Sequence, residues 1–200
     1  SYAIDSYQCA WLMKYFEPEW LCAYMETQSN NPIKRSKAIS ELMSLGYEIV
    51  PVDINHATKK WTILPGKKFM PSFLTVKSVG EAAVNEIFLN RPYKTVNDLL
   101  WKSDGTWKHS KFNKRALENL IKIRAFDSMD IVGQGKMFSS YKQMHAVLIG
   151  EFEYDKEKDK SKQIRDNTKD LKHKKKGRDK LEELLVEYSV PLVHDDFTQE

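Results

Sequence analysis

Cysteine is scarce in this chain, and so are the patterns that go with export or membranes. The two cysteines, Cys9 and Cys22, are thirteen residues apart on apolar helical faces, and no metal-ligand spacing connects them. We interpret them as reduced core thiols, which fits a cytosolic protein better than a disulfide scaffold. No apolar run approaches the roughly 18 residues of a membrane span, and no basic-then-apolar signal segment opens the chain. A membrane partner is therefore not expected.

The sequence also has little that could hold a metal ion or a nucleotide phosphate. None of the five histidines has a second ligand three or four positions along, so a zinc site is unsupported. No GxxxxGK[ST] loop occurs. The adjacent carboxylates Asp195 and Asp196 lie near the end of the chain, where a solvated terminus is the plain interpretation. Two-metal catalysis needs carboxylates that converge on one site, and the sequence does not indicate such a set.

Charge is distributed unevenly along the 200 residues, although the whole carries only +4. Residues 1–150 have a net charge of +6, residues 151–180 of +4 and residues 181–200 of −6. A modest positive field is compatible with phosphate binding. Residues 151–180 are nearly all polar or charged, and we predict a charged linker, a mobile tether or a solvated helix there. We expect residues 181–200 to form a C-terminal helix and tail.

Hydrophobic spacing predicts a mainly α fold with a small β element. Apolar residues at helical spacing indicate two helices within residues 3–28, broken near Glu17. Further elements follow in order: a helix over 33–45, an extended run over 47–52, strands over 61–64 and 69–73, and helices over 95–101, 113–123 and 136–149. The strand over 61–64 is expected to pair with 47–52 across a turn at Pro65–Gly66.

Residues 74–91 have the outline of a helix-hairpin-helix. The apolar run before Lys77 leads into a short turn, Lys77–Gly80, and a small-residue helix start follows at once. Such a turn presents backbone N–H groups to a phosphate, because the first N–H groups of a helix lack partners and its dipole is positive there. We assign the sharp turn and the close approach to Gly80. The alternative is a helical corner with a structural role only.

Several stretches of the chain resemble, in order, the C-family replicative DNA polymerases, the bacterial polymerase III alpha subunits. The resemblance covers roughly residues 1–130 and rests on Tyr7–Leu12, Glu19–Met25, Leu45–Asn55, Phe73–Arg91, Asn113–Ile121 and Ala125–Ser128. It implies a helical end of the fingers over 1–46, a short extended connector over 47–73 and a tandem helix-hairpin-helix region over 74–150. The second hairpin, around Ile123–Phe126, has Arg124 where the family prefers glycine.

The resemblance implies candidate DNA-binding residues in the first hairpin and at the start of a later helix. They are Lys77, Ser78, Val79, Gly80, Lys114 and Arg115, and a solvated face is the plainer interpretation of the last two. Ser78 stands where the family favours glycine. A second candidate is Gln134–Phe138, which resembles the pentapeptide that binds the sliding clamp through Gln134, Met137 and Phe138. The alternative is that Met137 and Phe138 face a helical core.

The resemblance also implies what this chain lacks. The family binds two Mg²⁺ ions through palm aspartates in a paired motif that is absent here, so we expect no cofactor in this chain. We expect a non-catalytic part that grips the duplex DNA backbone and completes a polymerase whose palm lies on another chain or upstream, in the cytoplasm of a bacterial or phage-infected cell. A start at Ser1 without Met suggests a fragment, a processed product or a split subunit. The alternatives are a stand-alone module that contacts replication proteins and a structural remnant.

Overall fold

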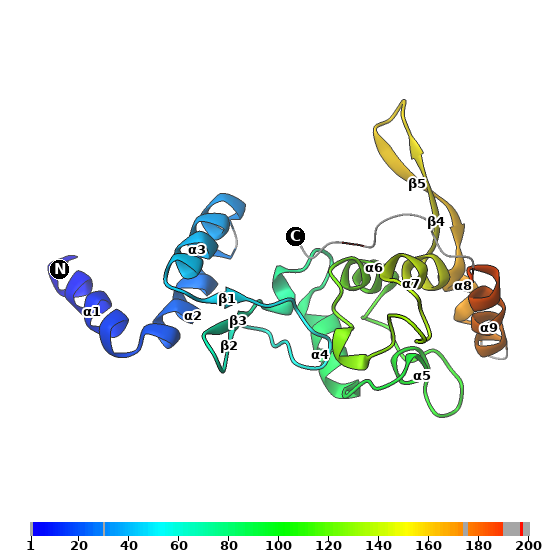
Figure 1. Cartoon of the computed structure of the whole chain (residues 1–200), viewed down its shortest axis with the longest axis horizontal. Helices are drawn as coiled ribbons and strands as arrows, with labels where there is room; N and C mark the ends of the chain where they lie inside the picture. The colour runs from blue at the N-terminus through cyan, green and yellow to red at the C-terminus, as the bar shows by residue number, and fades with distance from the viewer. Residues whose placement is uncertain (1, 30, 174–175, 190–196, 198–200) are drawn as a thin grey trace. The chain divides into compact units, whose positions relative to one another are not determined.

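The computed structural model describes residues 2–29, 31–173, 176–189 and 197. It divides into two compact units, which are taken in turn below. The first consists of residues 1–52 and 57–75, and the second of residues 53–56 and 76–200. The prediction of a mainly α fold with a small β element is confirmed (Figure 1). No helix within the described ranges is long and apolar enough to cross a membrane.

The first unit contains three helices and a small sheet. Its elements are α1 (Tyr2–Tyr15), α2 (Glu17–Gln28), α3 (Pro32–Ser44), β1 (Glu48–Ile49), β2 (Thr62–Leu64), β3 (Lys68–Met70) and the 3₁₀ turn η1 (Phe73–Thr75). The predicted break near Glu17 is confirmed, and Asn31 caps α3 by accepting from the N–H groups of Ile33 and Lys34. Its core cluster consists of Leu21, Met25, Ala38, Leu42, Tyr47, Trp61 and Phe69.

The strand order of this sheet corrects the predicted pairing. β3 lies in the middle, parallel to β1 and antiparallel to β2, so the order is β1-β3-β2. The strand at Trp61–Leu64 therefore does not pair with the run at 47–52. The Pro65–Gly66 turn joins β2 to β3, the next strand in sequence, because a loop this short favours antiparallel pairing of the two strands that it connects.

The second unit carries the hairpin region. Its elements are α4 (Glu81–Asn90), α5 (Val96–Leu100), α6 (Lys114–Lys122), η2 (Asp127–Met129), α7 (Tyr141–Leu148), β4 (Gly150–Asp155), β5 (Lys160–Asp166), α8 (Asn167–Leu171) and α9 (Gly177–Glu187). A capping box at Thr95 and Asp98 starts α5. Residues 53–56 join this unit, where the N–H of Ile54 donates to the carbonyl of Ala125 at 2.7 Å.

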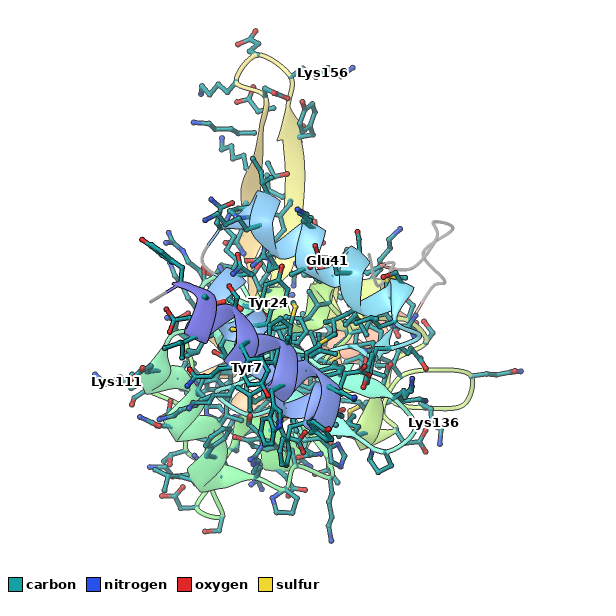
Figure 2. The ribbon with its side chains drawn as sticks, turned by 90° about the vertical axis from the view of Figure 1, so that its left-hand side faces the viewer. Tyr7, Tyr24, Glu41, Lys111, Lys136 and Lys156 are labelled. Atoms are coloured by element: carbon teal, nitrogen blue, oxygen red, sulfur yellow. The ribbon has the colours of Figure 1, made fainter. Side chains whose placement is uncertain are left out.

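The prediction of a linker, tether or solvated helix over 151–180 is wrong. Residues 150–166 form an antiparallel hairpin that projects from the unit, with Lys156 at its tip (Figures 1 and 2). Residues of opposite charge stand directly opposite each other in the register of the two strands, Glu153 opposite Lys162 and Asp155 opposite Lys160. Such pairs stabilise a hairpin that buries little apolar surface, which is why low hydrophobicity did not imply disorder here.

The end of the hairpin is fixed to the rest of the unit by buried polar groups. Asn167 is fully buried, and its side-chain amide donates to the carbonyls of Ala146 and Val147. The hydroxyl of Thr168 donates to the carbonyl of Leu148 at 3.2 Å. These bonds satisfy carbonyls at the C-terminal end of α7, which would otherwise lack partners. Residues 167–171 are therefore part of the folded unit.

Candidate nucleic-acid interface

The first hairpin turn, Lys77–Gly80, is a tight turn between η1 and α4. The N–H of Val79 donates to the carbonyl of Val76 at 3.2 Å, and Ser78 has a φ of 65°. Gly80 is the N-cap of α4, with an extended backbone of φ −94° and ψ 171°. The element before the turn is a single 3₁₀ turn, Phe73–Thr75. It occupies the place of the first helix of the hairpin.

This geometry corrects the role assigned to Gly80. The left-handed conformation that glycine favours lies at Ser78, two residues earlier, while the φ of Gly80 is open to any residue. A Cβ at position 80 would meet nothing within 4 Å. Because Gly80 has no Cβ, the backbone at the start of α4 is left uncovered.

The predicted contact residues of the first turn lie at the surface, with one exception. Lys77, Ser78 and Gly80 are exposed, whereas Val79 is 4% exposed and belongs to the core. No side chain caps the start of α4. The free N–H groups of its first turn, the helix dipole and the Lys77 ammonium together favour an anion at this position. The carboxylate of Glu81, in the same first turn, opposes it.

The second hairpin turn, Ile123–Phe126, also has one residue in the left-handed region, but it is used for packing. Arg124 has a φ of 59°, and its guanidinium lies over the ring of Tyr141 and 3.8 Å from Asp127. The carbonyl of Ala125 accepts from Ile54. Since the turn is occupied by other parts of the unit, it offers less backbone to a ligand than the first turn does.

The structure separates the two basic residues predicted on α6. The ammonium of Lys114 lies 2.9 Å from the carboxylate of Asp166 and also donates to Gln163, so it holds the base of the β4–β5 hairpin. Arg115 is exposed. Of the two, only Arg115 presents an uncommitted charge to solvent in the described part of the chain. Sequence spacing alone could not distinguish them, because the partners of Lys114 lie about fifty residues further along.

The predicted clamp-binding pentapeptide is divided between the surface and the core. Gln134 is exposed and Met137 is 43% exposed, but Phe138 is fully buried. The N–H of Phe138 donates to the carbonyl of Ile131 at 3.0 Å, and its carbonyl accepts from Gly133. The helix predicted over 136–149 begins only at Tyr141. A clamp contact through Phe138 would therefore require this side chain to leave the core.

Sequence reasoning missed a carboxylate that links the two hairpins. Glu86, on α4, accepts from the backbone N–H groups of Ser110, Lys111 and Phe112, which precede α6. Burial raises the pKa of the Glu86 carboxyl, but the three N–H donors more than offset this and hold the pKa below its usual value. No local signal marks Glu86, because its partners are some 25 residues away.

Asn55 is a second residue that sequence reasoning did not single out. Its side-chain amide donates to the carbonyl of Tyr93 at 2.9 Å and accepts from the N–H of Tyr93 at 2.8 Å. It also donates to the hydroxyl of Ser128. This residue therefore joins the loop after α4 to the second hairpin. The sequence signal that could have identified it is its position in the Asp53–Asn55 run, which belongs to one of the stretches that carry the family resemblance.

Among the described residues no group of three or more His, Cys, Asp or Glu side chains could hold a metal ion. Asp195 and Asp196 lie outside those residues.

Comparison with known proteins matches this region to a known motif and to one enzyme subunit. The helix-hairpin-helix motif family matches residues 46–134. The DNA polymerase III subunit alpha of Campylobacter jejuni is 35% identical over 133 residues, which is 64% of this chain and 11% of that protein. The subunit of Neisseria meningitidis serogroup B is 32% identical over 131 residues, 65% of this chain and 11% of the relative. That of Escherichia coli K12 is 29% identical over 133 residues, with 64% and 11% coverage.

This chain spans about a tenth of the length of these relatives. The matched residues include both hairpin turns and the helices α4 and α6 that follow or precede them. The expected resemblance is therefore confirmed: residues 46–134 match the helix-hairpin-helix motif family, and about 65% of this chain is similar to part of the bacterial DNA polymerase III alpha subunit.

Proposed function

We propose that this chain is a non-catalytic, duplex-binding part of a replicative DNA polymerase. It grips the phosphate backbone without reading bases, because contacts to phosphate position a protein but carry no sequence information. The observation that carries this proposal is the first hairpin turn, where Lys77 and the uncapped start of α4 are exposed together. Arg115 supplies a further exposed charge.

A partner polypeptide is favoured by α1. None of its side chains is buried, and several large apolar residues are exposed, among them Tyr2, Ile4, Tyr7, Trp11, Leu12 and Tyr15. Tyr7 stands on this helix in Figure 2. A patch of this kind normally meets another protein surface. In our proposal that surface is the catalytic portion of the polymerase, which brings the palm carboxylates and Mg²⁺, in the cytoplasm of a bacterial or phage-infected cell.

Binding to duplex DNA tests the proposal. The full chain is titrated with two duplexes of equal length and unrelated sequence at several salt concentrations. We expect equal affinities and a log–log salt slope of roughly −2 to −4, since each neutralised duplex phosphate adds about −0.9. A marked preference for one sequence, or binding that ignores salt, would contradict backbone gripping.

Primer extension tests the non-catalytic part of the proposal. The purified chain with Mg²⁺ and all four deoxynucleotides should not extend a primed template, and activity should appear only with a palm-containing partner. Extension by the chain alone would contradict it. The alternative, a scaffold for replication proteins, would be supported by a chain that binds a polymerase partner but not duplex DNA.

A further inference from the structure

A second basic surface lies outside the region that the motif family matches. Residues 169–180 contain seven Lys or Arg and two Asp, which is a net charge of +5 within twelve residues. The match to the motif family ends at residue 134. The hairpin proposal therefore leaves this charge without a role.

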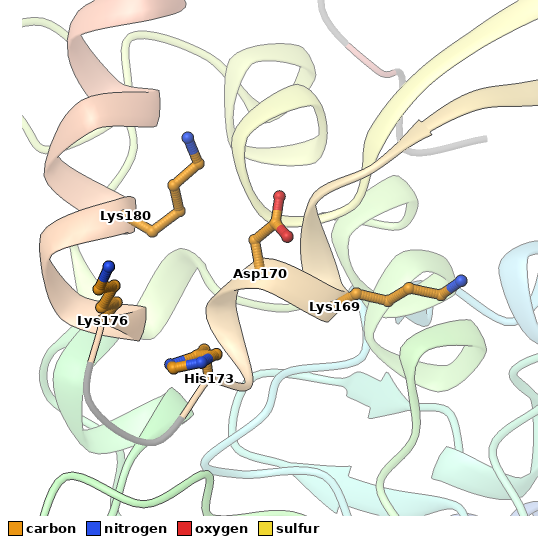
Figure 3. Close-up of a pocket in the computed structure, with 5 residues that line it drawn as sticks. All are labelled: Lys169, Asp170, His173, Lys176 and Lys180. Carbon is orange, nitrogen blue, oxygen red and sulfur yellow. The ribbon is translucent and has the colours of Figure 1, made fainter.

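The helices α8 and α9 form a pocket at this surface, the basic pocket. It is lined by Lys169, Asp170, His173, Lys176 and Lys180. Figure 3 shows Lys180 on α9 and Lys176 just before it, facing Asp170 on α8 and His173 just after α8, whereas Lys169 extends away from them. The centre of the pocket is thus bordered by two ammonium groups and one carboxylate, with Lys169 at its flank.

The corner that carries these lysines is packed rather than loose. The indole N–H of Trp101 donates to the carbonyl of Leu171 at 3.3 Å, and both residues are buried. Gly177 lies against the carbonyl of Leu171, and a Cβ at position 177 would be 2.2 Å from that carbonyl oxygen. The N–H of Gly177 donates to the carbonyl of His173 at 3.0 Å. These contacts hold the end of α8 against the start of α9.

Most of the positive charge in the pocket is not neutralised by the protein. Lys180 pairs with Glu183 at 2.9 Å, but Glu183 is largely exposed, and such surface pairs contribute little. Lys169 and Lys176 have no carboxylate within ion-pair distance in the ranges that the structure describes. A polyanion would supply the negative charge that Lys169 and Lys176 lack among the described residues.

We infer that the basic pocket is a second binding site for the phosphodiester backbone of DNA, built by α8 and α9 and independent of the first hairpin turn. Lysine binds phosphate as a point charge rather than through a fixed bidentate geometry, so this contact is sequence-independent. The inference rests on the proposed function for its choice of DNA over other polyanions. It adds a contact that the matched motif does not contain.

The test is the salt slope for duplex binding by the full chain carrying Lys176→Gln and Lys180→Gln. The slope should become shallower by about 0.9 for each phosphate that the variant no longer neutralises, and so by up to about 1.8. The control is Lys34→Gln with Lys37→Gln, two exposed lysines on α3, one of which also has a loose carboxylate partner, Glu41. Circular dichroism and Tm verify that both variants are folded.

Three outcomes decide the inference. A shallower slope in the pocket variant, with the control unchanged, supports it. A pocket variant that binds duplex like the parent overturns it. If binding to polyglutamate falls while binding to DNA does not, the pocket takes an acidic protein segment and the inference is again overturned. Single-stranded DNA, measured beside the duplex, identifies the form of DNA preferred.

The same substitutions in a Lys77→Ala, Gly80→Val background separate the two sites. A further fall in slope means that the pocket acts on its own. If the hairpin substitutions change nothing while the pocket substitutions do, the hairpin contact of the proposed function fails and the pocket stands. If the pocket substitutions have no effect in either background, the pocket fails and the hairpin contact is judged separately.

Discussion

Ser78 and Arg124 adopt the same left-handed backbone conformation, with φ values of 65° and 59°, in the turns of the two hairpins. Neither residue is glycine, although the left-handed region costs a residue with a Cβ about 1–2 kcal/mol. At Arg124 the cation–π contact with Tyr141 and the ion pair with Asp127 offset that cost. Ser78 has no such compensation in the described structure, and its strain lies at the proposed DNA contact.

Ser78→Gly should therefore stabilise the protein. The substitution removes the left-handed penalty of about 1–2 kcal/mol but adds the entropy cost of glycine, about 0.5–1 kcal/mol, so we expect a gain of up to about 1.5 kcal/mol in the free energy of unfolding. Urea denaturation measures it. The control is Ser36→Gly on the exposed face of α3, which should destabilise the protein because glycine weakens a helix. A lower free energy of unfolding for Ser78→Gly than for the parent would contradict the claim that the backbone at Ser78 is strained.

Glu86→Gln should destabilise the hairpin region at neutral pH. The carboxylate accepts from three backbone N–H groups, and hydrogen bonds to a charged acceptor contribute about 1.5–3 kcal/mol. Glu81→Gln, at the exposed start of the same helix, is the control and should have little effect on the free energy of unfolding. Equal effects of the two substitutions would mean that the three bonds do not hold α4 to the loop before α6.

The pH dependence of stability should follow from the same carboxyl. Its pKa in the folded protein is lower than in the unfolded chain, so the unfolded state binds the proton more readily. The contribution of Glu86 is therefore complete above the unfolded pKa of about 4.3 and is lost as the pH falls through the folded value. The parent should lose more stability than Glu86→Gln between pH 6 and pH 3. Parallel curves would contradict this assignment.

Phe138→Ala should cost about 3–5 kcal/mol, as expected for a fully buried aromatic side chain. Met137→Ala, one residue earlier and 43% exposed, should cost far less. Thermal denaturation of the two variants measures the difference. If both substitutions leave Tm unchanged, Phe138 is not a core residue, and the clamp-binding interpretation of Gln134–Phe138 becomes the better one.

Lys114→Ala and Arg115→Ala should affect different properties, Lys114→Ala the stability of the protein and Arg115→Ala the salt dependence of duplex binding. Lys114 is bound to Asp166 and Gln163, so its removal should lower stability and leave the salt slope for duplex binding unchanged. Arg115 is exposed, so its removal should leave stability within about 0.5 kcal/mol and make the slope shallower by about 0.9 if it contacts one phosphate. A shallower salt slope for Lys114→Ala, together with lower stability for Arg115→Ala, would mean that Lys114 contacts DNA and Arg115 stabilises the fold.

The sequence predicted elements that local signals define. The break near Glu17, the helix that Asn31 caps and the short helix that Thr95 begins all carry capping or turn residues, and all are present. The first hairpin turn was located from its small residues and Lys77. The left-handed position in this turn was assigned to the wrong residue, because the identity of a residue does not reveal its φ. It lies at Ser78, where glycine would be expected, and not at Gly80.

What the sequence did not predict depends on distant contacts. The β4–β5 hairpin has the period-2 alternation of a strand, with Phe152 and Tyr154 between acids, but high charge density was given more weight than the alternation. The partners of Lys114 and Glu86 are 49 and about 25 residues away. Burial of Phe138 was one of two interpretations of the same five residues, and only tertiary structure separates them.

Duplex binding by Lys77→Ala with Gly80→Val is the most direct test of the central claim. Position 80 has an extended φ and open space, so valine should fold normally and only crowd the start of α4. The control is Lys34→Ala with Ala23→Val, an equal change in charge and a similar change in volume at exposed positions on α3 and α2. We predict a shallower salt slope and weaker binding for the hairpin variant alone. Binding equal to that of the parent, at matched Tm, would contradict the claim that this turn holds DNA.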